Sequence, residues 1–499
     1  MKSSSIIIIG AGVGGLAAAA HLARRGLHVT VVEKTSQPGG RCNQFTHEGH
    51  TFDSGPTLLV MPLLYEAEFN SLGISAECMH EMLGLQRVDP TYHLVFDDGS
   101  GLALTSDMKS MRDQLENIEK GSFEGFLRYK EEGKRHYDLA MERLVNRDFR
   151  CALEFFTLNN LPLLFQIKPL IRHYDNMSAY FKHPRLKTVF TFQDVYMGLS
   201  PFEAPATFSM MPYTELAHGV WYPKGGMYQV VEALMTLARK AGVEFIFDTT
   251  VERIEIEGTR ARGVLLEHSQ RLAADAVLAN ADLPYVYQDL LPEDGRAERM
   301  KRKKFSCSVI SFFWGVNKRC EKLSPHTLFL ADDYRENFES IIDDLALPQN
   351  PSIYVHAPAR LDPSMAPPDE DTLIAIVPVG HLSEKGDQDW PALRDQARRS
   401  VFRRLETLGI TDLEDHLKFE VSYTPQSWQK RYNLMKGSTH GLSHNLLQLG
   451  YFRPRNRHPA YHNLYFTGAS THPGTGIPTA LVSGRLSAQR IMDEQGMSG

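Results

Sequence analysis

Three glycines near the start of the chain have the spacing of a phosphate-binding turn. The β-branched run 6–9 predicts a buried parallel strand, and the glycines follow it as G-x-G-x-x-G. The first glycine permits a tight turn, the second lets the backbone approach a pyrophosphate, and the third allows close helix–strand packing. A helix beginning there would point its N–H groups at the phosphates. The residues expected at this turn are Gly10, Gly12, Val13, Gly14 and Gly15.

An acidic residue closes the next predicted strand, VTVVEK at 29–34. Glu33 lies about 20 residues beyond the glycines, where a carboxylate can hold a pair of ribose hydroxyls, and Lys34 follows it. An acid at this position favours a free 2′-hydroxyl group. The sequence therefore predicts a site for FAD or NAD rather than NADP.

A second glycine pair follows in PGGRCNQFTHEGHTFDSGPT at 38–57. Gly39 and Gly40 permit close backbone approach, and Arg41 offers a forked donor to phosphate. In this order, GAGVGG, EK, PGGR and FDSGP resemble the amine-oxidase-type FAD flavoproteins. Within them, the chain most resembles the carotenoid desaturases of the bacterial and fungal phytoene desaturase type.

The resemblance recurs along most of the chain, at 218–234, 277–284, 424–457 and 463–478. It implies FAD as the cofactor and stepwise desaturation of a C30 or C40 polyene such as phytoene, with isomerisation of a central cis bond. It also implies a quinone or oxygen as the electron acceptor. The further residues expected at FAD are Gly40, Arg41, Gly55, Pro56, Thr57, Val251, Asn280, Ala281, Asp282, Gly468, Ala469, Gly476, Ile477 and Pro478.

Acid–base residues for such a reaction are harder to identify. A polyene has no charged group, so we expect a long apolar tunnel that aims a C–H bond at the flavin. The departing proton is very acidic and hardly requires a strong base, although a carboxylate could stabilise developing positive charge. The catalytic candidates are Arg147 and Asp148 in NRDFR, Glu215, and His472 in the loop THPGTGIP.

Three of these candidates have structural alternatives. NRDFR is also typical of a salt-bridged surface turn, and His472 is equally typical of a helix-cap or backbone-bonded residue. No metal site is expected, because the histidines of HEGH at 47–50 lack a helix and further ligands.

These motifs require an α/β fold in which a Rossmann-like FAD-binding domain is interleaved with an α+β substrate domain of mixed sheet and helices. The alternating run SCSVISFFWGVNK at 306–318 predicts a strand of that mixed sheet. The predicted FAD-binding segments are 1–105, 222–290 and 441–499. The predicted substrate segments are 106–221, which also includes a candidate membrane-associating region, and 291–440.

That candidate region is 155–181, where apolar residues alternate with cations and two prolines. It is too broken to span a bilayer. One interpretation is a packed helix pair lining the substrate domain, and the other is a segment lying on a membrane surface. The basic run KRKK at 301–304 suits either anionic lipid or solvent.

Composition limits the remaining possibilities. The chain has 499 residues, a net charge of −6 and ordinary globular contents of hydrophobic (42%) and charged (23%) residues, which give no global attraction to nucleic acid. Five cysteines without a CxxC pair are typical of a reduced compartment. The glycine motif argues against a cleaved signal peptide. These features indicate a cytoplasmic protein, and the membrane-resident hydrocarbon substrates that the resemblance implies place it peripherally on the cell membrane.

Two other functions fit parts of the pattern. A related oxidase or saturase could act on another apolar substrate or on an amine, but THPGTGIP does not resemble the corresponding amine oxidase loop. A lipid-binding relative without flavin, like the Rab escort proteins, would not need an intact PGGR motif.

Overall fold

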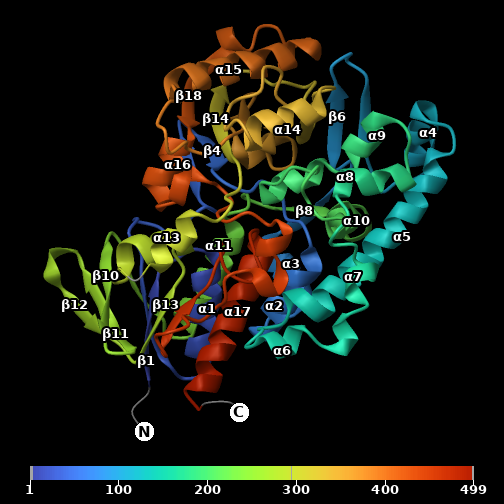
Figure 1. Ribbon diagram of the computed structural model, residues 1–499. Coiled ribbons are helices and arrows are strands. Elements are labelled where there is room, and N and C mark those ends of the chain that lie inside the picture. The colour runs from blue at the N-terminus through green and yellow to red at the C-terminus, as the bar shows by residue number, and fades with distance from the viewer. Residues whose placement is uncertain (1–3, 294, 497–499) are drawn as a thin grey trace.

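The computed structural model describes residues 4–293 and 295–496. Figure 1 shows a lower part built around one parallel sheet and an upper part built around a larger sheet, with helices along one side of both. The lower sheet has the order β19-β13-β1-β2-β9, and all its pairs are parallel. Its strands are β1 (Ser5–Ile9), β2 (His28–Val32), β9 (Glu244–Ile246), β13 (Ala276–Ala279) and β19 (Leu464–Phe466).

Both faces of the parallel sheet are covered, which explains why its strands are almost continuously apolar. Ile6 and Ile8 of β1 pack among three helices, while Ile7 and Ile9 pack against a three-stranded sheet. The helices are α1 (Val13–Arg24), α11 (Gln229–Lys240) and α17 (Ile477–Glu494). The small sheet consists of β10 (Val251–Glu257), β11 (Arg260–Leu266) and β12 (Arg271–Ala273).

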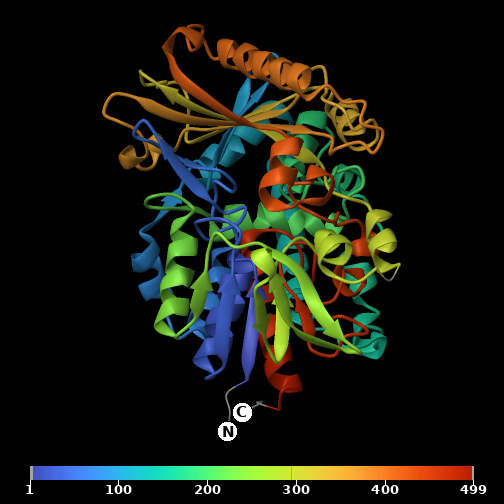
Figure 2. The ribbon, with the colours of Figure 1, turned by 90° about the vertical axis from the view of Figure 1, so that its left-hand side faces the viewer.

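The upper sheet has seven strands in the order β18-β14-β17-β16-β15-β6-β7, and is mixed because β15 and β6 pair in parallel. Figure 2 shows α15 (Trp390–Thr407) lying over its outer face. The strands are β6 (Tyr92–Phe96), β7 (Gly101–Leu104), β14 (Ser308–Val316), β15 (His326–Leu330), β16 (Ile353–His356), β17 (Asp371–Val379) and β18 (Leu417–Tyr423). The predicted α/β fold with a mixed second sheet is confirmed, including its strand at 306–318.

The sheet pairing differs from one predicted boundary. Strands β6 and β7 lie inside the segment 1–105, which was predicted to belong wholly to the FAD-binding domain. In the structure β6 pairs with β15 and so belongs to the upper sheet. The cause is long-range pairing between strands more than two hundred residues apart, which local patterns do not reveal.

A helical region fills the side of the molecule between the two sheets (Figure 1). Its elements are α5 (Ser122–Ala140), η1 (Met141–Val145), α6 (Ala152–Phe155), η2 (Leu158–Asn160), α7 (Leu163–Gln166), η4 (Phe192–Met197) and α10 (Met210–His218). Within the predicted region 155–181, residues 155–171 form short helical turns with several exposed apolar side chains, whereas His173, Met177 and Phe181 are buried. None of the described helices is long and apolar enough to cross a bilayer.

Candidate active site

Four parallel strands end at one edge of the lower sheet, and predicted cofactor residues follow each of them. Gly10 follows β1, Glu33 follows β2, Asn280 follows β13, and Gly468 comes shortly after β19. Ligands of open parallel sheets bind outside the carboxyl ends of the strands. α1 also begins at this edge, so its N-terminal N–H groups are directed towards the same place.

The glycine turn leaves no room for a side chain at its third glycine. A Cβ atom on Gly15 would lie 2.3 Å from the carbonyl oxygen of Gly10. α1 can therefore begin directly beside the end of β1 only if this residue is glycine. Such close helix–strand packing is the function predicted for the third glycine of the motif.

Glu33 is a buried carboxylate held in place by the chain. Its Oε2 atom accepts a hydrogen bond from the Ala11 amide at 2.8 Å, and Oε1 accepts from the Thr35 amide at 3.0 Å and the Thr35 hydroxyl at 2.8 Å. Carboxylate oxygens have further acceptor capacity, which a ribose hydroxyl pair can use. Beside it, the Lys34 ammonium donates to Asn433 Oδ1 at 2.9 Å.

Arg41 supplies positive charge to the same space. Its Nη1 atom donates to the carbonyl oxygen of Thr439 at 2.8 Å, its only hydrogen bond to the described residues. A guanidinium has five N–H groups, so donors are left for a phosphate. Burial lowers the pKa of Arg41, and the carboxylate of Asp282 opposes that shift. This is the chemistry that a pyrophosphate-binding residue needs.

One cavity of about 530 Å³ joins the predicted cofactor residues. All of them except Gly15 line it, although they come from widely separated parts of the chain. Those lining residues are Gly10, Gly12, Val13, Gly14, Glu33, Lys34, Gly40, Arg41, Gly55, Pro56, Thr57, Val251, Asn280, Ala281, Asp282, Gly468, Ala469, Gly476, Ile477 and Pro478. The fixed carboxylate at Glu33, the free donors of Arg41 and the glycine turn fit FAD.

The cavity continues beneath the upper sheet, along residues that were not predicted as site residues. On β14, Val309, Ser311 and Phe313 line it, whereas Ile310 and Phe312 pack on the opposite face towards α15. The alternation of side chains between the two faces of this predicted strand was the signal that could have identified them. Other lining residues not predicted are Tyr92, Phe192, Tyr196, Leu328, Tyr334, Phe338, Tyr354, Ile374 and Ile376.

The charged residues that line the cavity all lie in one half of it. In the described chain, its charged lining residues are Glu33, Lys34, Arg41 and Asp282, all of them predicted cofactor residues. His440 also lines it, but burial lowers its pKa to about 4, so the imidazole is neutral. The half beneath the upper sheet is therefore apolar with scattered hydroxyl and amide groups.

Two buried side chains hold the loop between β19 and α17. Arg453 donates to the carbonyl oxygens of Thr471 at 3.0 Å and Ser443 at 3.1 Å, and to three more carbonyls described below. Asn456 Nδ2 donates to the carbonyl oxygen of His472 at 3.0 Å and to the Ser483 hydroxyl of α17 at 3.1 Å. This loop carries cofactor-cavity residues at both ends, so these contacts fix one wall of the cavity.

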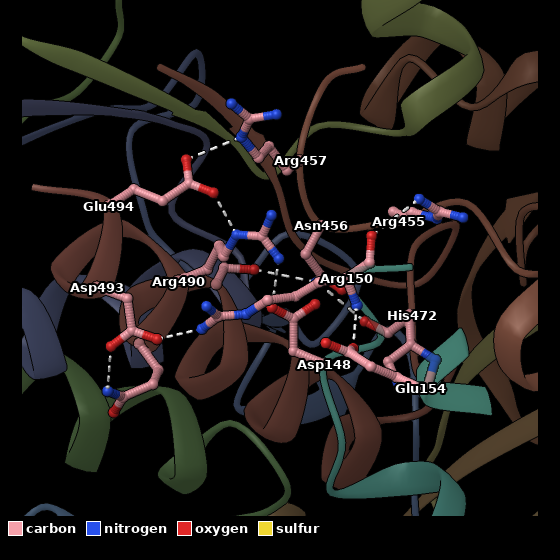
Figure 3. A network of polar contacts seen from close by, with 12 residues as sticks. Asp148, Arg150, Glu154, Arg455, Asn456, Arg457, His472, Arg490, Asp493 and Glu494 are labelled. Carbon is pink, nitrogen blue, oxygen red and sulfur yellow. Dashed lines mark hydrogen bonds and ion pairs between the residues drawn. The ribbon is translucent and has the colours of Figure 1, made fainter. Parts of the chain in front are cut away.

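Arg147 and Asp148 do not line the cavity. Asp148 accepts a hydrogen bond at 3.0 Å from Arg490 of α17, and the neighbouring Arg150 pairs with Asp493 (Figure 3). Arg147 donates to the carbonyl oxygen of Glu142 at 3.3 Å. NRDFR thus forms a salt-bridged turn against α17, and a direct part in catalysis has no support from this geometry.

His472 also lies outside the cavity lining. Its ring is buried and packs edge-on to Phe149 with 5.7 Å between ring centres, and neither nitrogen has a hydrogen-bond partner of good geometry among the described residues. Burial lowers the pKa of His472 to about 4, so the imidazole stays neutral. Figure 3 shows it beside the Asp148 network.

We expect His472→Ala to keep the FAD content and the turnover of the wild type. The imidazole does not line the cavity, and the loop backbone is held by Asn456 rather than by this ring. The measurement is flavin absorbance per protein after purification, together with turnover. A variant with normal FAD content but lost turnover would show that His472 takes part in the reaction.

Glu215 does not line the cavity but contacts a residue that does. It is 3% exposed on α10, whose Met210 and Met211 line the cavity. Its carboxylate accepts hydrogen bonds from Gln193 Nε2 at 3.0 Å and from the Tyr92 hydroxyl at 3.4 Å. Of the four catalytic candidates from sequence, it is the one that contacts a residue lining the cavity.

Fold and site together define a flavoprotein with a dinucleotide-type FAD site. The flavin containing amine oxidoreductase family matches over residues 13–492. A phytoene desaturase of Fusarium fujikuroi is 40% identical over 99% of this chain and 90% of its own length, and a zeta-carotene-forming phytoene desaturase of Myxococcus xanthus is 41% identical over 98% and 93%. A putrescine oxidase variant has the same fold, with a TM-score of 0.65 and 16% identity over 98% of this chain and 99% of its own.

The chain belongs to the flavin containing amine oxidoreductase family and, within it, is related to the phytoene desaturases. It is an FAD-dependent oxidoreductase. The family resemblance and the FAD cofactor predicted from sequence are both confirmed.

Proposed function

We propose that this protein introduces double bonds stepwise into phytoene or a related C30 or C40 polyene in carotenoid biosynthesis. The observation that carries the proposal is the uncharged half of the cavity, which adjoins the cofactor residues and offers a substrate only apolar walls and neutral polar groups. An apolar chain loses little on entering such a space, because no buried charge is left without a partner. The phytoene desaturases described above favour the same substrate class.

Bound FAD supplies hydride acceptance, the chemistry that a C–H bond of a saturated segment requires. The chain supplies position: the upper sheet covers the substrate, and the loops below hold the cofactor against it. Walls of Val309, Phe313 and Ile374 exclude water from the reacting bond. A quinone or oxygen is proposed to reoxidise the flavin.

An amine substrate fits this cavity less well. A protonated amine buried among apolar residues requires a carboxylate partner. The acidic lining residues in the described chain, Glu33 and Asp282, both lie among the cofactor residues, where Asp282 accepts from Ser470 at 2.6 Å. An amine oxidase therefore remains the second candidate only on grounds of fold.

The test is an assay of purified protein reconstituted with FAD, given phytoene in liposomes with either a quinone or oxygen. Longer-wavelength polyene absorbance is the expected result, and the acceptor that supports it identifies the electron route. Putrescine and benzylamine serve as comparison substrates. A yellow protein that oxidises an amine and leaves phytoene unchanged would overturn the proposal.

We further infer that the protein docks on a membrane through an apolar patch. The patch consists of Leu153, Phe156, Leu158, Leu161, Phe165 and Leu170, which are between 58% and 88% exposed. Exposed apolar clusters of this kind mark interaction surfaces. Phe156 also contacts the exposed Phe452, which extends the patch.

The position of the patch suits uptake of a lipid-soluble substrate. Met141 and Val145 of η1 line the cavity, and the Arg143 guanidinium in the same turn donates to the carbonyl oxygen of Asn159 in η2 at 2.8 Å. The patch therefore contacts the helical turn that borders the cavity. A polyene leaving a bilayer at this surface would have a short path to the flavin.

The double variant Leu158→Asp/Phe165→Asp is expected to bind vesicles at least ~10-fold more weakly than wild type, because each side chain loses about 1.5–3 kcal/mol of apolar burial. Co-sedimentation with phospholipid vesicles is the measurement, and FAD content should not change. Met82→Asp/Leu127→Asp is the matched control, since both residues are 43% exposed outside the patch. Equal loss in both double variants would rule out this docking surface.

A further inference from the structure

A buried carboxyl group and two phenols form a hydrogen-bonded chain that begins at the cavity wall. Tyr92 on β6 and Tyr196 on η4 both line the cavity, and their hydroxyl groups are in direct hydrogen-bond contact. The Tyr92 hydroxyl lies 3.4 Å from Oε1 of Glu215, and Gln193 Nε2 holds Oε2 at 3.0 Å. This chain of hydrogen bonds thus leads from the cavity wall to the carboxyl group of Glu215, which the substrate cannot reach.

The environment of Glu215 is unusual for a structural carboxylate. It is 3% exposed, and no ion pair reaches it from the described residues. An ionised carboxylate without a cation is costly to bury, so a fold that needed only a helix contact here would gain stability from an amide or an apolar residue. Its position beside two cavity hydroxyls points to proton chemistry.

We propose that Glu215 takes up the proton released during desaturation, through the hydroxyl groups of Tyr196 and Tyr92. This inference rests on the proposed polyene substrate. The carbon next to the one that gives up hydride to the bound flavin loses its proton, and the electron pair of that C–H bond becomes the new double bond. The proton reaches Tyr196 Oη, Tyr196 passes its own proton to Tyr92, and Tyr92 passes its proton to Oε1 of Glu215.

The titration of the carboxyl group suits this role. Burial raises the pKa of Glu215 to about 7, although hydrogen bonds from Gln193, Tyr196 and Tyr92 oppose the rise. The titratable groups that face it from the surrounding elements are phenols: Tyr92, Tyr196 and, on α5, Tyr129. Burial raises the pKa of each phenol well above 10, so Glu215 is the group of this cluster that titrates near neutrality.

Glu215 can accept a proton only when its carboxyl group is ionised. Below about pH 7 the carboxyl group is protonated and cannot accept a proton, and above it the carboxylate can. The rate of flavin reduction by polyene should therefore rise with pH between about pH 6 and about pH 8. Glu215→Gln, which keeps the shape but cannot titrate, should lower this rate by ~100-fold and remove the rise.

The experiment is anaerobic single-turnover reduction of the flavin by phytoene, followed at several pH values. Tyr92→Phe and Tyr196→Phe should also slow it, and Glu215→Asp should restore part of the rate with its pH dependence. Glu68→Gln is the matched control, because Glu68 is a buried carboxylate of α2 (Pro62–Ser71) paired with Arg485 at 2.7 Å, away from the cavity. It should keep the wild-type profile.

A second readout does not depend on turnover. Infrared difference spectra between about pH 6 and about pH 8 should contain a protonated carboxyl band in the wild type that Glu215→Gln lacks. If Glu215→Gln keeps the wild-type pH profile, the proton route is wrong. If it slows the reaction but the rise with pH persists, Glu215 is only structural. If the wild-type flavin is not reduced by any polyene, the proposed function fails instead.

Discussion

Gly476→Val is expected to abolish FAD retention while leaving most of the fold intact. Gly476 has φ +108° and immediately precedes α17, in a loop where Thr475, Ile477 and Pro478 line the cofactor cavity. A β-branched residue avoids this backbone region, at a cost of about 1–3 kcal/mol. The nearest atom to an added Cβ, the Thr479 hydroxyl, is 3.3 Å away, so the conflict is chiefly in the backbone.

The strain can be relieved only by rotating the loop, which moves the cavity wall away from the flavin. Every 1.4 kcal/mol corresponds to a tenfold change in affinity, so FAD should bind at least ~10-fold more weakly and be lost from the protein on gel filtration. Flavin absorbance after gel filtration and titration of the apoprotein with FAD measure this loss.

Gly99→Val is the matched control. Gly99 also has a positive φ, +79°, but it lies in the turn between β6 and β7, and no atom would lie within 4 Å of an added Cβ. This variant should lose stability and keep its FAD. If both variants retain FAD equally, the loop at Gly476 does not shape the cofactor site.

The sequence predicted the site best where the backbone geometry requires particular residue types. The cofactor residues at 251, 280–282 and 468–478 were predicted from the family resemblance. By contrast, a glycine motif between a strand and a helix, followed by Glu33, has few structural solutions and could be predicted from the residues themselves. The same holds for Arg41, whose neighbours Gly39 and Gly40 identify a close approach. These predictions depend on local geometry, which neighbouring residues determine.

The substrate wall could not be predicted in the same way. Tyr92, Phe192, Tyr196 and Tyr354 come from three unconnected stretches and meet only because β6 joins the upper sheet through β15. Glu215 was identified as a candidate carboxylate, but its partners depend on that same long-range pairing. Asp148 had two interpretations from the sequence, a catalytic carboxylate and a salt-bridged turn, and its pairing with Arg490 favours the second.

Arg453 is a buried residue whose position could not be predicted from its neighbours in the sequence. It occurs in FRPRNR at 452–457, a run that is typical of a solvated basic turn. In the structure it is 1% exposed, with no carboxylate in direct contact among the described residues. Burial lowers the pKa of Arg453 to about 9, and the more distant Asp282 opposes that shift. No local pattern distinguishes this arginine from its exposed neighbour Arg455.

Arg455→Met is the matched control for Arg453→Met. Arg455 is exposed, and its guanidinium contacts the Tyr451 hydroxyl and the carbonyl oxygen of Arg150 at the surface. Surface substitutions of this kind usually change stability by less than about 0.5 kcal/mol. We expect normal FAD content and nearly normal unfolding for this variant.

Arg453→Met is expected to destabilise the protein by at least ~3 kcal/mol and to remove FAD. The guanidinium donates to five backbone carbonyls, those of Leu442, Ser443, Gln448, Ala469 and Thr471. Methionine fills similar space but donates nothing, and each buried carbonyl left unsatisfied costs about 1–3 kcal/mol. Since Ala469 lines the cavity, the loss of its anchor also opens the cofactor site. Denaturant unfolding and flavin content measure the two effects.

Arg453→Lys keeps the charge but not the planar fork, so it should restore only part of both; full recovery with lysine would show that charge, rather than the hydrogen-bond geometry, holds the loop.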